Sequence, residues 1–422
     1  MKRLTIGDLV VGAYIFVVTR ALLGMLLNGP SDFRNFVEDR SPLLNVAFFS
    51  VHLIFIFLAL FSINQLNKIK INFLPVIALI FWCAASVSWS DNPYRTIIFS
   101  SFIAMQALVA ASICATMTYE RFFSILKFTS TVILTLSLIF IFLMPSYGRM
   151  TLVFPGFWQG IFTHKNVLGQ FCAIACIVYL VSYAEKRRAT DLILTITTFF
   201  VLYQTHSSTA LLAVLASMVV LFFFTMRRIH ALLILVMTVG LGAIAVIDFD
   251  TTWKTALTVL GKSETLTGRT TVWTLAFDAI STHPILGFGF GAFWTSYEAE
   301  RLRGLADWYV PHAHNGFLEV LLQIGVSGLV LFFIVLYSAL RNSLVAVRNT
   351  KLANRLFPVL FLVVFLVLGL AEITYLNINY LFQLILFMVS GYNFSQAEVV
   401  KLEIKEYEKT AGPSRRDPIA IA

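Results

Sequence analysis

Long apolar segments separated by short polar ones fill most of this chain. An α-helix needs about 20 apolar residues to cross the hydrocarbon core of a bilayer. Segments near that length lie at 9–27, 43–63, 73–89, 96–118, 123–144, 166–184, 190–205, 209–226, 229–247, 316–340, 356–372 and 374–393. The pattern therefore predicts about twelve transmembrane helices. The division between 190–205 and 209–226 depends on a tight polar turn at residues 204–208.

The composition supports lipid as the solvent for much of this apolar surface. Hydrophobic residues make up 59% of the chain and charged residues 13%, and the mean hydropathy is +0.84. Soluble domains carry about 25% charged residues, so we expect an all-α integral membrane protein. The net charge of +9 does not indicate nucleic-acid binding, because the basic residues lie in short clusters between apolar segments, where they set membrane topology.

The longest interruption of the apolar pattern divides the chain into four regions. Residues 1–247 hold the first nine predicted spans, and residues 248–315 form one large loop in which we expect short amphipathic helices. Residues 316–394 hold the last three spans. Residues 395–422 are charged, mixed in sign and rich in Gly, Pro and Ser near the end, so we expect a disordered tail.

The basic residues also predict the orientation of the chain. With the N-terminus in the cytoplasm, the inner loops carry Lys2, Arg3, Lys68, Lys70, Arg121, Lys186, Arg187, Arg188, Arg227, Arg228, Arg341, Arg348, Lys351 and Arg355, and the tail adds five more. The short outer loops carry few. Because cytoplasmic loops are enriched in Lys and Arg, we expect both termini in the cytoplasm. The 248–315 loop then lies on the outer face of the membrane, which in a Gram-negative cell is the periplasmic face.

A few polar residues interrupt the predicted spans. Arg20 and Glu372 lie inside them, and buried charge in a membrane is a functional candidate by default. The alternatives are that Arg20 snorkels to the interface and that Glu372 caps a helix end facing water. Cys83, Cys114, Cys172 and Cys176 lie in apolar runs, which favours packed thiols over a metal site.

The predicted outer face concentrates cations. It carries Arg149, His164, Lys165, His206, Arg269, His283, Arg301, Arg303, His312 and His314. Such a set beside the lipid boundary suits an anionic, lipid-borne substrate. Arg holds two charged oxygens of a diphosphate with its planar fork, and Lys supplies a point charge.

Arg269 lies where a helix begins. Val272, Trp273, Ala276, Phe277 and Ile280 recur at helical spacing after Gly268. Arg269 then belongs to the first turn of an amphipathic helix resting on the membrane, where free N–H groups favour anions. The alternative is an arginine exposed to solvent or to lipid headgroups.

Histidines precede two of the predicted spans. His312 and His314 bracket an alanine, so they point to opposite faces if the segment is extended, and only one need face a site. A histidine there accepts a proton near neutral pH; the alternative is interfacial hydrogen bonding or capping. His164 and Lys165 begin the span at 166–184, as an anion-binding helix start or as a cap and topology anchor.

Three motifs in order resemble a known family. They are the segment 162–169 (Phe-Thr-His-Lys-Asn-Val-Leu-Gly), the segment 267–273 followed by His283-Pro284 and several glycines, and His314-Asn315 followed by Gly325-Val326-Ser327-Gly328. Together they resemble the O-antigen ligase/polymerase superfamily of bacterial membrane proteins. The His-Lys-Asn element is most similar to the exopolysaccharide polymerases of that superfamily.

The resemblance implies a GT-C-like glycosyltransferase with a periplasmic site. The donor is a glycan on undecaprenyl diphosphate, transferred with inversion and without a nucleotide sugar, cofactor or required metal. The acceptor is lipid A–core in the ligases and another lipid-linked repeat unit in the polymerases. By position, Arg269 is the diphosphate clamp, and His314 is the base or the residue that orients the acceptor.

One position departs from the family pattern. Members often carry a basic residue in a Ser-rich turn, which here falls near Ser208. His206, Lys165 and Arg149 are the candidates to replace it, and His312 is a further contact to the substrate. We therefore expect an exopolysaccharide-type polymerase, with an O-antigen ligase as the nearest alternative. A transporter or flippase is disfavoured, because the charges lie at the ends of spans rather than at the midplane.

Overall fold

A computed structural model describes residues 5–22, 46, 49–55, 70–151, 154–225, 269–306, 310–348, 353–376, 380–392 and 394. The regular secondary structure of these residues is helical, apart from one isolated bridge between Arg149 and Trp158, and turns and loops connect the helices. The helices are α1 (Ile6–Val18), α5 (Lys70–Ala85), α6 (Pro93–Thr116), α7 (Tyr119–Leu143), α8 (Pro145–Gly148), α9 (Lys165–Lys186), α10 (Ala189–Gln204), α11 (Ser208–Thr225), α14 (Arg269–Thr282), α15 (Tyr297–Leu305), α16 (Gly316–Arg348), α17 (Phe357–Gly369) and α18 (Tyr380–Gly391). Three short 3₁₀ turns accompany them: η2 (Ser86–Trp89), η4 (Phe293–Thr295) and η5 (Ala353–Leu356).

Five of the described helical segments are long and apolar enough to cross a membrane. They cover residues 72–89, 93–116, 119–143, 165–186 and 316–348, and five shorter apolar helices accompany them. The predicted division of 190–205 from 209–226 is confirmed by α10 and α11. The count of about twelve spans stays a prediction, because the run 229–247 and most of 43–63 lie outside the described residues.

Three predicted spans differ from the helices observed. The run 9–27 contains α1, which ends at Val18, because Arg20 and Leu22 adopt left-handed backbone angles (φ 54° and 61°). The run 356–372 contains α17, which ends at Gly369, so Glu372 lies beyond the helix. The described helix in 374–393 begins only at Tyr380. Both charges predicted inside spans therefore lie just after helix ends.

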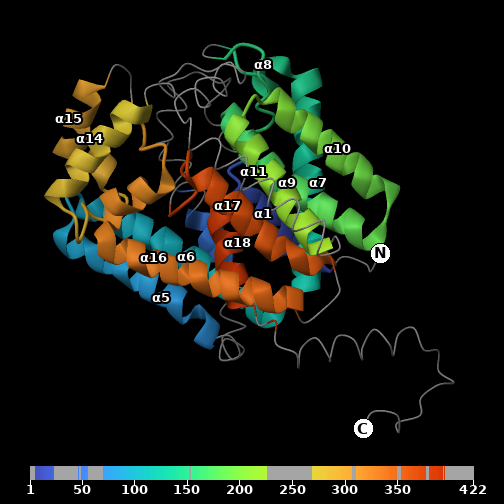
Figure 1. Ribbon diagram of the computed structural model, residues 1–422, viewed down its shortest axis with the longest axis horizontal. Coiled ribbons are helices and arrows are strands. Elements are labelled where there is room, and N and C mark those ends of the chain that lie inside the picture. The colour runs from blue at the N-terminus through green and yellow to red at the C-terminus, as the bar shows by residue number, and fades with distance from the viewer. Residues whose placement is uncertain are drawn as a thin grey trace, which may run out of the picture.

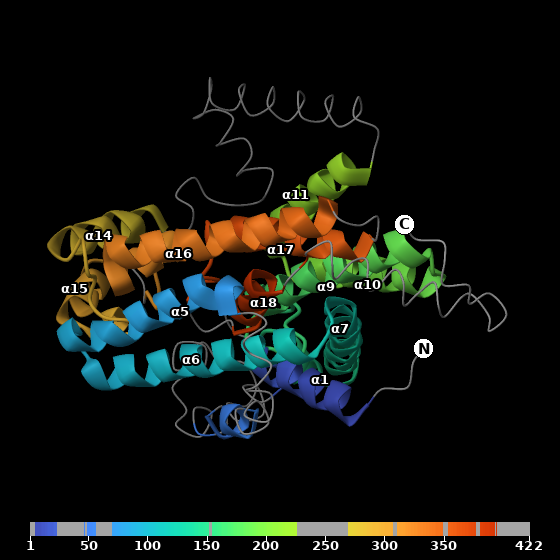
Figure 2. The ribbon, with the colours of Figure 1, turned by 90° about the horizontal axis from the view of Figure 1, so that it is seen from below.

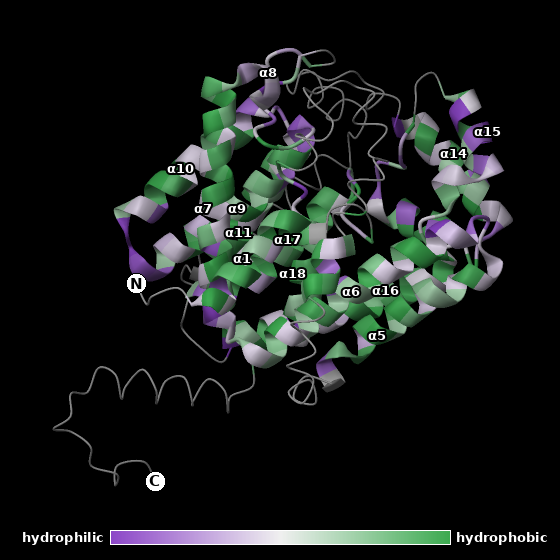
Figure 3. Ribbon diagram, turned by 180° about the vertical axis from the view of Figure 1, so that it is seen from behind, coloured by the Kyte–Doolittle hydropathy of each residue, from purple (hydrophilic) through white to green (hydrophobic). Residues whose placement is uncertain are grey.

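The helices pack as a bundle with a smaller lobe at one end. Figures 1 and 2 show α14 and α15 together at that end, beside the start of α16, while α9, α11 and α17 pack against one another in the main bundle. We call residues 269–306 the α14–α15 lobe. Its core joins Val272 and Ala276 of α14 to Phe293 and to Leu318 and Leu322 of α16. In Figure 3 hydrophobic residues dominate the bundle helices, and hydrophilic ones gather near helix ends and in the lobe.

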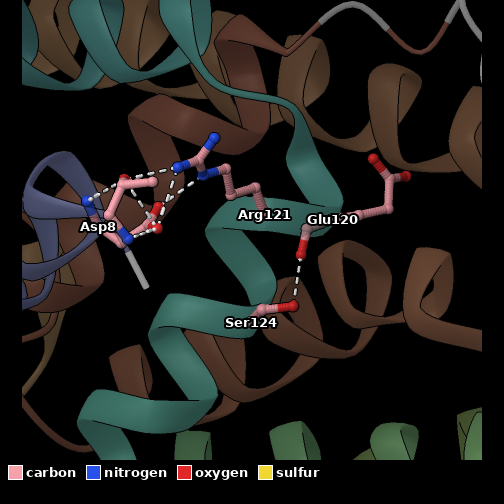
Figure 4. Close-up of polar contacts among 5 residues, drawn as sticks. Asp8, Glu120, Arg121 and Ser124 are labelled. Carbon is pink, nitrogen blue, oxygen red and sulfur yellow. Dashed lines mark hydrogen bonds and ion pairs between the residues drawn. The ribbon is translucent and has the colours of Figure 1, made fainter. Parts of the chain in front are cut away.

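Ion pairs join the helix ends at the face of the bundle away from the lobe. Arg121 of α7 donates to Asp8 of α1, with Nη2 3.0 Å from Oδ2, and Figure 4 shows Glu120 pointing away from this pair. Glu120 instead accepts from Arg355 in η5. In the topology predicted from the basic residues, all of these helix ends are cytoplasmic, and they lie together as that topology requires.

The longest of the described helices, α16, is broken at Gly325. This glycine has φ 66° and ψ −171°, outside the helical region. A break leaves backbone groups without helical partners, which is costly where lipid replaces water. The loop 284–289 of the α14–α15 lobe supplies those partners. The pairs, donor first, are Phe288 with Leu322 (2.9 Å), Gly289 with Gln323 (2.9 Å), Val326 with Pro284 (2.9 Å) and Ser327 with Ile285 (3.2 Å).

Candidate functional site

Arg269, the first residue of α14, reaches across to the end of α17. Its Nη1 donates to the carbonyl oxygen of Ala371 (2.9 Å), and its Nη2 lies 3.4 Å from Oε1 of Glu372. The helical spacing after Gly268 correctly predicted that Arg269 belongs to a first turn. Its guanidinium is mostly buried rather than exposed to solvent.

Glu372 joins three segments at this point. Its Oε1 also accepts from Nδ2 of Asn166 in the first turn of α9 (3.1 Å). The side chain is buried, so Glu372 does not cap a helix end facing water. Its carboxylate instead offsets part of the Arg269 charge and fixes the start of α14 to the start of α9.

His312 and His314 lie against each other. Their ring centroids are 3.9 Å apart, and Nδ1 of His312 accepts from the backbone N–H of His314 (3.2 Å). The extended conformation that would place them on opposite faces is not adopted, because His314 lies in the left-handed region, with φ 49°. Both imidazoles therefore belong to the same cluster.

The environment keeps these imidazoles neutral. Burial, helped by the charge of Arg269 and by His164, lowers the pKa of His314 to about 3. Burial, His314, Arg269 and His164 likewise lower the pKa of His312 well below its usual range. At neutral pH each ring therefore keeps a nitrogen able to accept a proton. Trp273, one turn after Arg269 on α14, donates to the carbonyl oxygen of Ala313 (3.0 Å), and this bond brings the start of α14 beside the pair.

His164 is the N-cap of α9, as its position before a span suggested. Its Nδ1 accepts from the backbone N–H of Asn166 (3.2 Å). That bond assigns the ring proton to Nε2. Burial and the neighbouring charge of Lys165 lower the pKa of His164 to about 3, so the helix start holds a neutral imidazole beside a cation.

Lys165 places its ammonium against the Ser-rich turn that lacks a basic residue. Nζ lies 3.4 Å from the carbonyl oxygen of His206 and above the rings of Phe154 and Phe157, 4.5 and 5.0 Å from their centroids. His206 stacks on Phe157 with centroids 4.1 Å apart. The turn can approach α9 this closely because Gly169 has no side chain. A Cβ at that position would lie only 2.7 Å from Cβ of Ser207.

Arg149 lies at a different corner. Its Nε donates to the carbonyl oxygen of Ile141 (3.2 Å), and its backbone bridges to Trp158. Figures 1 and 3 show α8, which directly precedes it, across the molecule from α14. The contacts and electrostatic effects described here group Arg269, His164, His312 and His314, with Lys165 and His206 adjoining. The backbone of Arg149 lies beside the segment that holds Phe157, but its guanidinium is directed to Ile141 instead of this group.

The remaining predicted outer-face cations make local contacts in the α14–α15 lobe and with the segment that follows it. Arg301 pairs with Glu298 at 2.8 Å, three residues earlier in α15. Arg303 donates to the carbonyl oxygens of Val310 and Trp294. His283 contacts Thr282 and packs on Phe288. These contacts stabilise the lobe rather than the Arg269 cluster.

Three residues of this region did not stand out in the sequence as site residues. Asn166 was part of the His-Lys-Asn motif but received no role, although it bonds Glu372. Trp273 and Glu319 both bond the backbone of Ala313, between the two histidines. Glu319 carried one signal, since it is a carboxylate one turn into an apolar span.

The region that contains Arg269 and the histidine pair matches a known family. Residues 192–333 match the family model described as O-Antigen ligase. The resemblance to the O-antigen ligase/polymerase superfamily is confirmed. An 88-residue stretch is also 35% identical to the exopolysaccharide production protein ExoQ of Rhizobium meliloti (strain 1021). That stretch covers 20% of this chain and 20% of the relative.

The region that matches the O-antigen ligase model contains only part of the group formed around Arg269 and the two histidines. It begins within α10, includes α11 and the α14–α15 lobe, and ends within α16, past the break at Gly325. His164, Lys165 and Asn166 precede it, and Glu372 follows it. The cluster therefore joins the family region to side chains from both of its flanks.

Proposed function

We propose that this protein is a glycosyltransferase that transfers a glycan from undecaprenyl diphosphate to a hydroxyl group at the periplasmic face of the inner membrane. The observation that carries the proposal is the bond from Trp273, one turn after Arg269 on α14, to the backbone between His312 and His314, inside the region that matches the O-antigen ligase model. A fixed cation and a proton acceptor at the ends of membrane helices are what a lipid diphosphate donor and a hydroxyl acceptor require.

Arg269 binds the diphosphate in this proposal. Its two terminal nitrogens now contact Ala371 and Glu372, and the donor's phosphate oxygens compete for the same N–H groups. Preorganised charge in a partly dry site stabilises the negative charge that develops on the leaving diphosphate. Lys165 supplies a second cation at the turn where the family's basic residue is missing.

His314 accepts the proton of the attacking hydroxyl. The acceptor oxygen forms a bond to the anomeric carbon as the bond to the diphosphate oxygen breaks, and the diphosphate keeps that electron pair. Attack from the opposite side inverts the anomeric centre. The pKa of about 3 belongs to the free site, and a bound diphosphate anion raises it, because an opposite charge favours the protonated imidazole.

A polymerase is the form of this activity that we favour. The His-Lys-Asn element and the similarity to a protein named for exopolysaccharide production support it. The purified protein is given an undecaprenyl-diphosphate-linked repeat unit, with EDTA, and with or without lipid A–core. We expect a ladder of longer lipid-linked glycans in both conditions.

The other outcomes of that assay separate the alternatives. Product formed only with lipid A–core identifies a ligase, which the family model's description favours, and leaves the roles of Arg269 and His314 in place. The break in α16 is a feature that some transporters share. Movement of the donor across a vesicle membrane without any glycan transfer would establish transport and refute the proposal.

A further inference from the structure

The peptide groups of Ala313, between the two histidines, are held from two sides. The indole Nε1 of Trp273 donates to the carbonyl oxygen of Ala313 (3.0 Å). The backbone N–H of Ala313 donates to Oε2 of Glu319 (3.2 Å). The side chain of Ala313 is itself fully buried. The backbone between His312 and His314 is therefore fixed at both its donor and its acceptor.

The two contacts come from α14, which begins at Arg269, and from α16, which follows the histidine loop. Trp273 lies one turn after Arg269 on α14, so its bond sets the distance between the Arg269 helix and the histidine loop. Glu319 lies in the first turn of α16, which follows that loop. Together, Trp273 and Glu319 fix the position of His314 relative to Arg269. They do so through the backbone of Ala313, and neither has a described contact with the side chain of Arg269 or His314.

Glu319 is held rigidly enough to serve this purpose. It is fully buried, and its Oε1 accepts from Nε1 of Trp294 (2.7 Å) and from Nε2 of Gln323 (2.9 Å). Oε1 of Gln323 in turn accepts from the backbone N–H of Gly291 (2.9 Å). A buried polar network that is satisfied in this way fixes one geometry.

The backbone at His314 requires such support. A residue other than glycine at φ 49° adopts a sparsely populated conformation that persists where its surroundings determine it. Release of the Ala313 peptide would let His314 return to the extended region. The ring of His314 would then turn away from His312.

We infer that Trp273 and Glu319 are positioning residues that hold His314 in register with Arg269 for transfer. This inference rests on the proposed function, in which His314 takes the proton of the acceptor. It assigns to these two side chains the alignment of base and diphosphate clamp, and no contact with substrate.

The test compares two tryptophan variants of the purified full-length protein. Trp273→Phe removes the indole N–H and keeps an aromatic ring. Trp89→Phe is the matched control, because Nε1 of Trp89 also donates to a backbone carbonyl at 3.0 Å, that of Leu286. We expect Trp273→Phe to lower kcat on the order of 10- to 100-fold with the donor KM within about twofold, since misplacement by 1 Å can have that effect. Trp89→Phe should leave kcat unchanged.

A second variant and a double mutant complete the test. Glu319→Gln leaves one oxygen acceptor where three N–H donors converge. We therefore expect a similar loss of kcat. If Trp273→Phe does not fold, Glu319→Gln alone tests the inference. Adding Trp273→Phe to His314→Ala should cause no further loss. A normal kcat in both Trp273→Phe and Glu319→Gln, with His314→Ala inactive, would overturn the positioning role and leave the proposed function intact. Full activity of His314→Ala would overturn both.

Discussion

The neutral buried histidines of this site should make the stability of the protein depend on pH. In an unfolded chain a histidine binds its proton near pH 6.5, whereas His164 and His314 bind theirs only near pH 3 in the folded protein. Between those values the unfolded state holds more protons than the folded state. The contribution of these two histidines to the free energy of unfolding is therefore fully present above about pH 6.5. It is lost progressively as the pH falls toward about 3.

We predict that the thermal unfolding midpoint of the detergent-solubilised protein decreases as the pH is lowered from about 7 to about 5. His314→Gln should reduce that dependence, because it removes one of the groups that must stay neutral. His283→Gln, at an exposed histidine of the α14–α15 lobe, is the control and should leave the dependence unchanged. Equal pH dependence in wild type and His314→Gln would show that His314 is not held neutral.

The sequence anticipated the residue types of the cluster better than their contacts. Arg269 at a helix start and His164 as an N-cap followed from local spacing. The pairing of His312 with His314 did not, because left-handed backbone at a histidine has no clear signal in sequence. Nor did the roles of Trp273 and Glu319, since both act on backbone atoms of Ala313, which every residue type possesses.

At the scale of elements, the break in α16 determines where the α14–α15 lobe docks. Hydropathy could not reveal it, because Gly325 lies within an apolar run that reads as one span. The division of α10 from α11 was visible, because polar residues mark that turn. Apolar runs located the described helices, but they misplaced the helix ends near Arg20 and Glu372, because apolar residues surround each of these charges.

We predict that Gly325→Ala weakens both folding and transfer. Its backbone angles are essentially restricted to glycine, and a Cβ would lie 2.2 Å from the carbonyl oxygen of Ile285. The strain is about 1–3 kcal/mol before the clash is counted. We expect a lower unfolding midpoint and a several-fold loss of activity in the purified variant.

Gly304→Ala provides the control for that experiment. A Cβ at Gly304 meets no atom within 4 Å, and the residue lies in α15 of the same lobe. Its midpoint and activity should match the wild type. If Gly325→Ala behaved like Gly304→Ala, the pairing of the 284–289 loop with the broken helix would not be needed for function.

At the scale of the whole molecule, helix ends gather at two opposite faces. The start of α9, the end of α17 and the start of α16 meet at the candidate site, while the starts of α1 and α7 meet at the Asp8–Arg121 ion pair. This agrees with the alternation predicted from the basic residues. Which face is periplasmic remains a prediction from those residues.

Labelling of introduced cysteines tests that orientation. Gly304→Cys, at an exposed position in the lobe, should react with a membrane-impermeant maleimide in spheroplasts. Arg188→Cys, exposed between α9 and α10, should react only after the membrane is permeabilised. The native Cys83, Cys172 and Cys176 are buried and Cys114 is partly exposed, so labelling of the unmodified protein gives the background. The reverse pattern would place the cluster in the cytoplasm.

The central claim is that Arg269 stabilises the departing diphosphate, and one comparison of initial rates tests it most directly. Arg269→Gln and Arg301→Gln each remove one positive charge from the α14–α15 lobe, but Arg301 is half exposed and pairs with Glu298 within its own helix. With a purified lipid-linked donor, we predict at least a roughly 100-fold loss of kcat for Arg269→Gln. Arg301→Gln should stay within about twofold of wild type. Equal rates for the two variants would contradict the account.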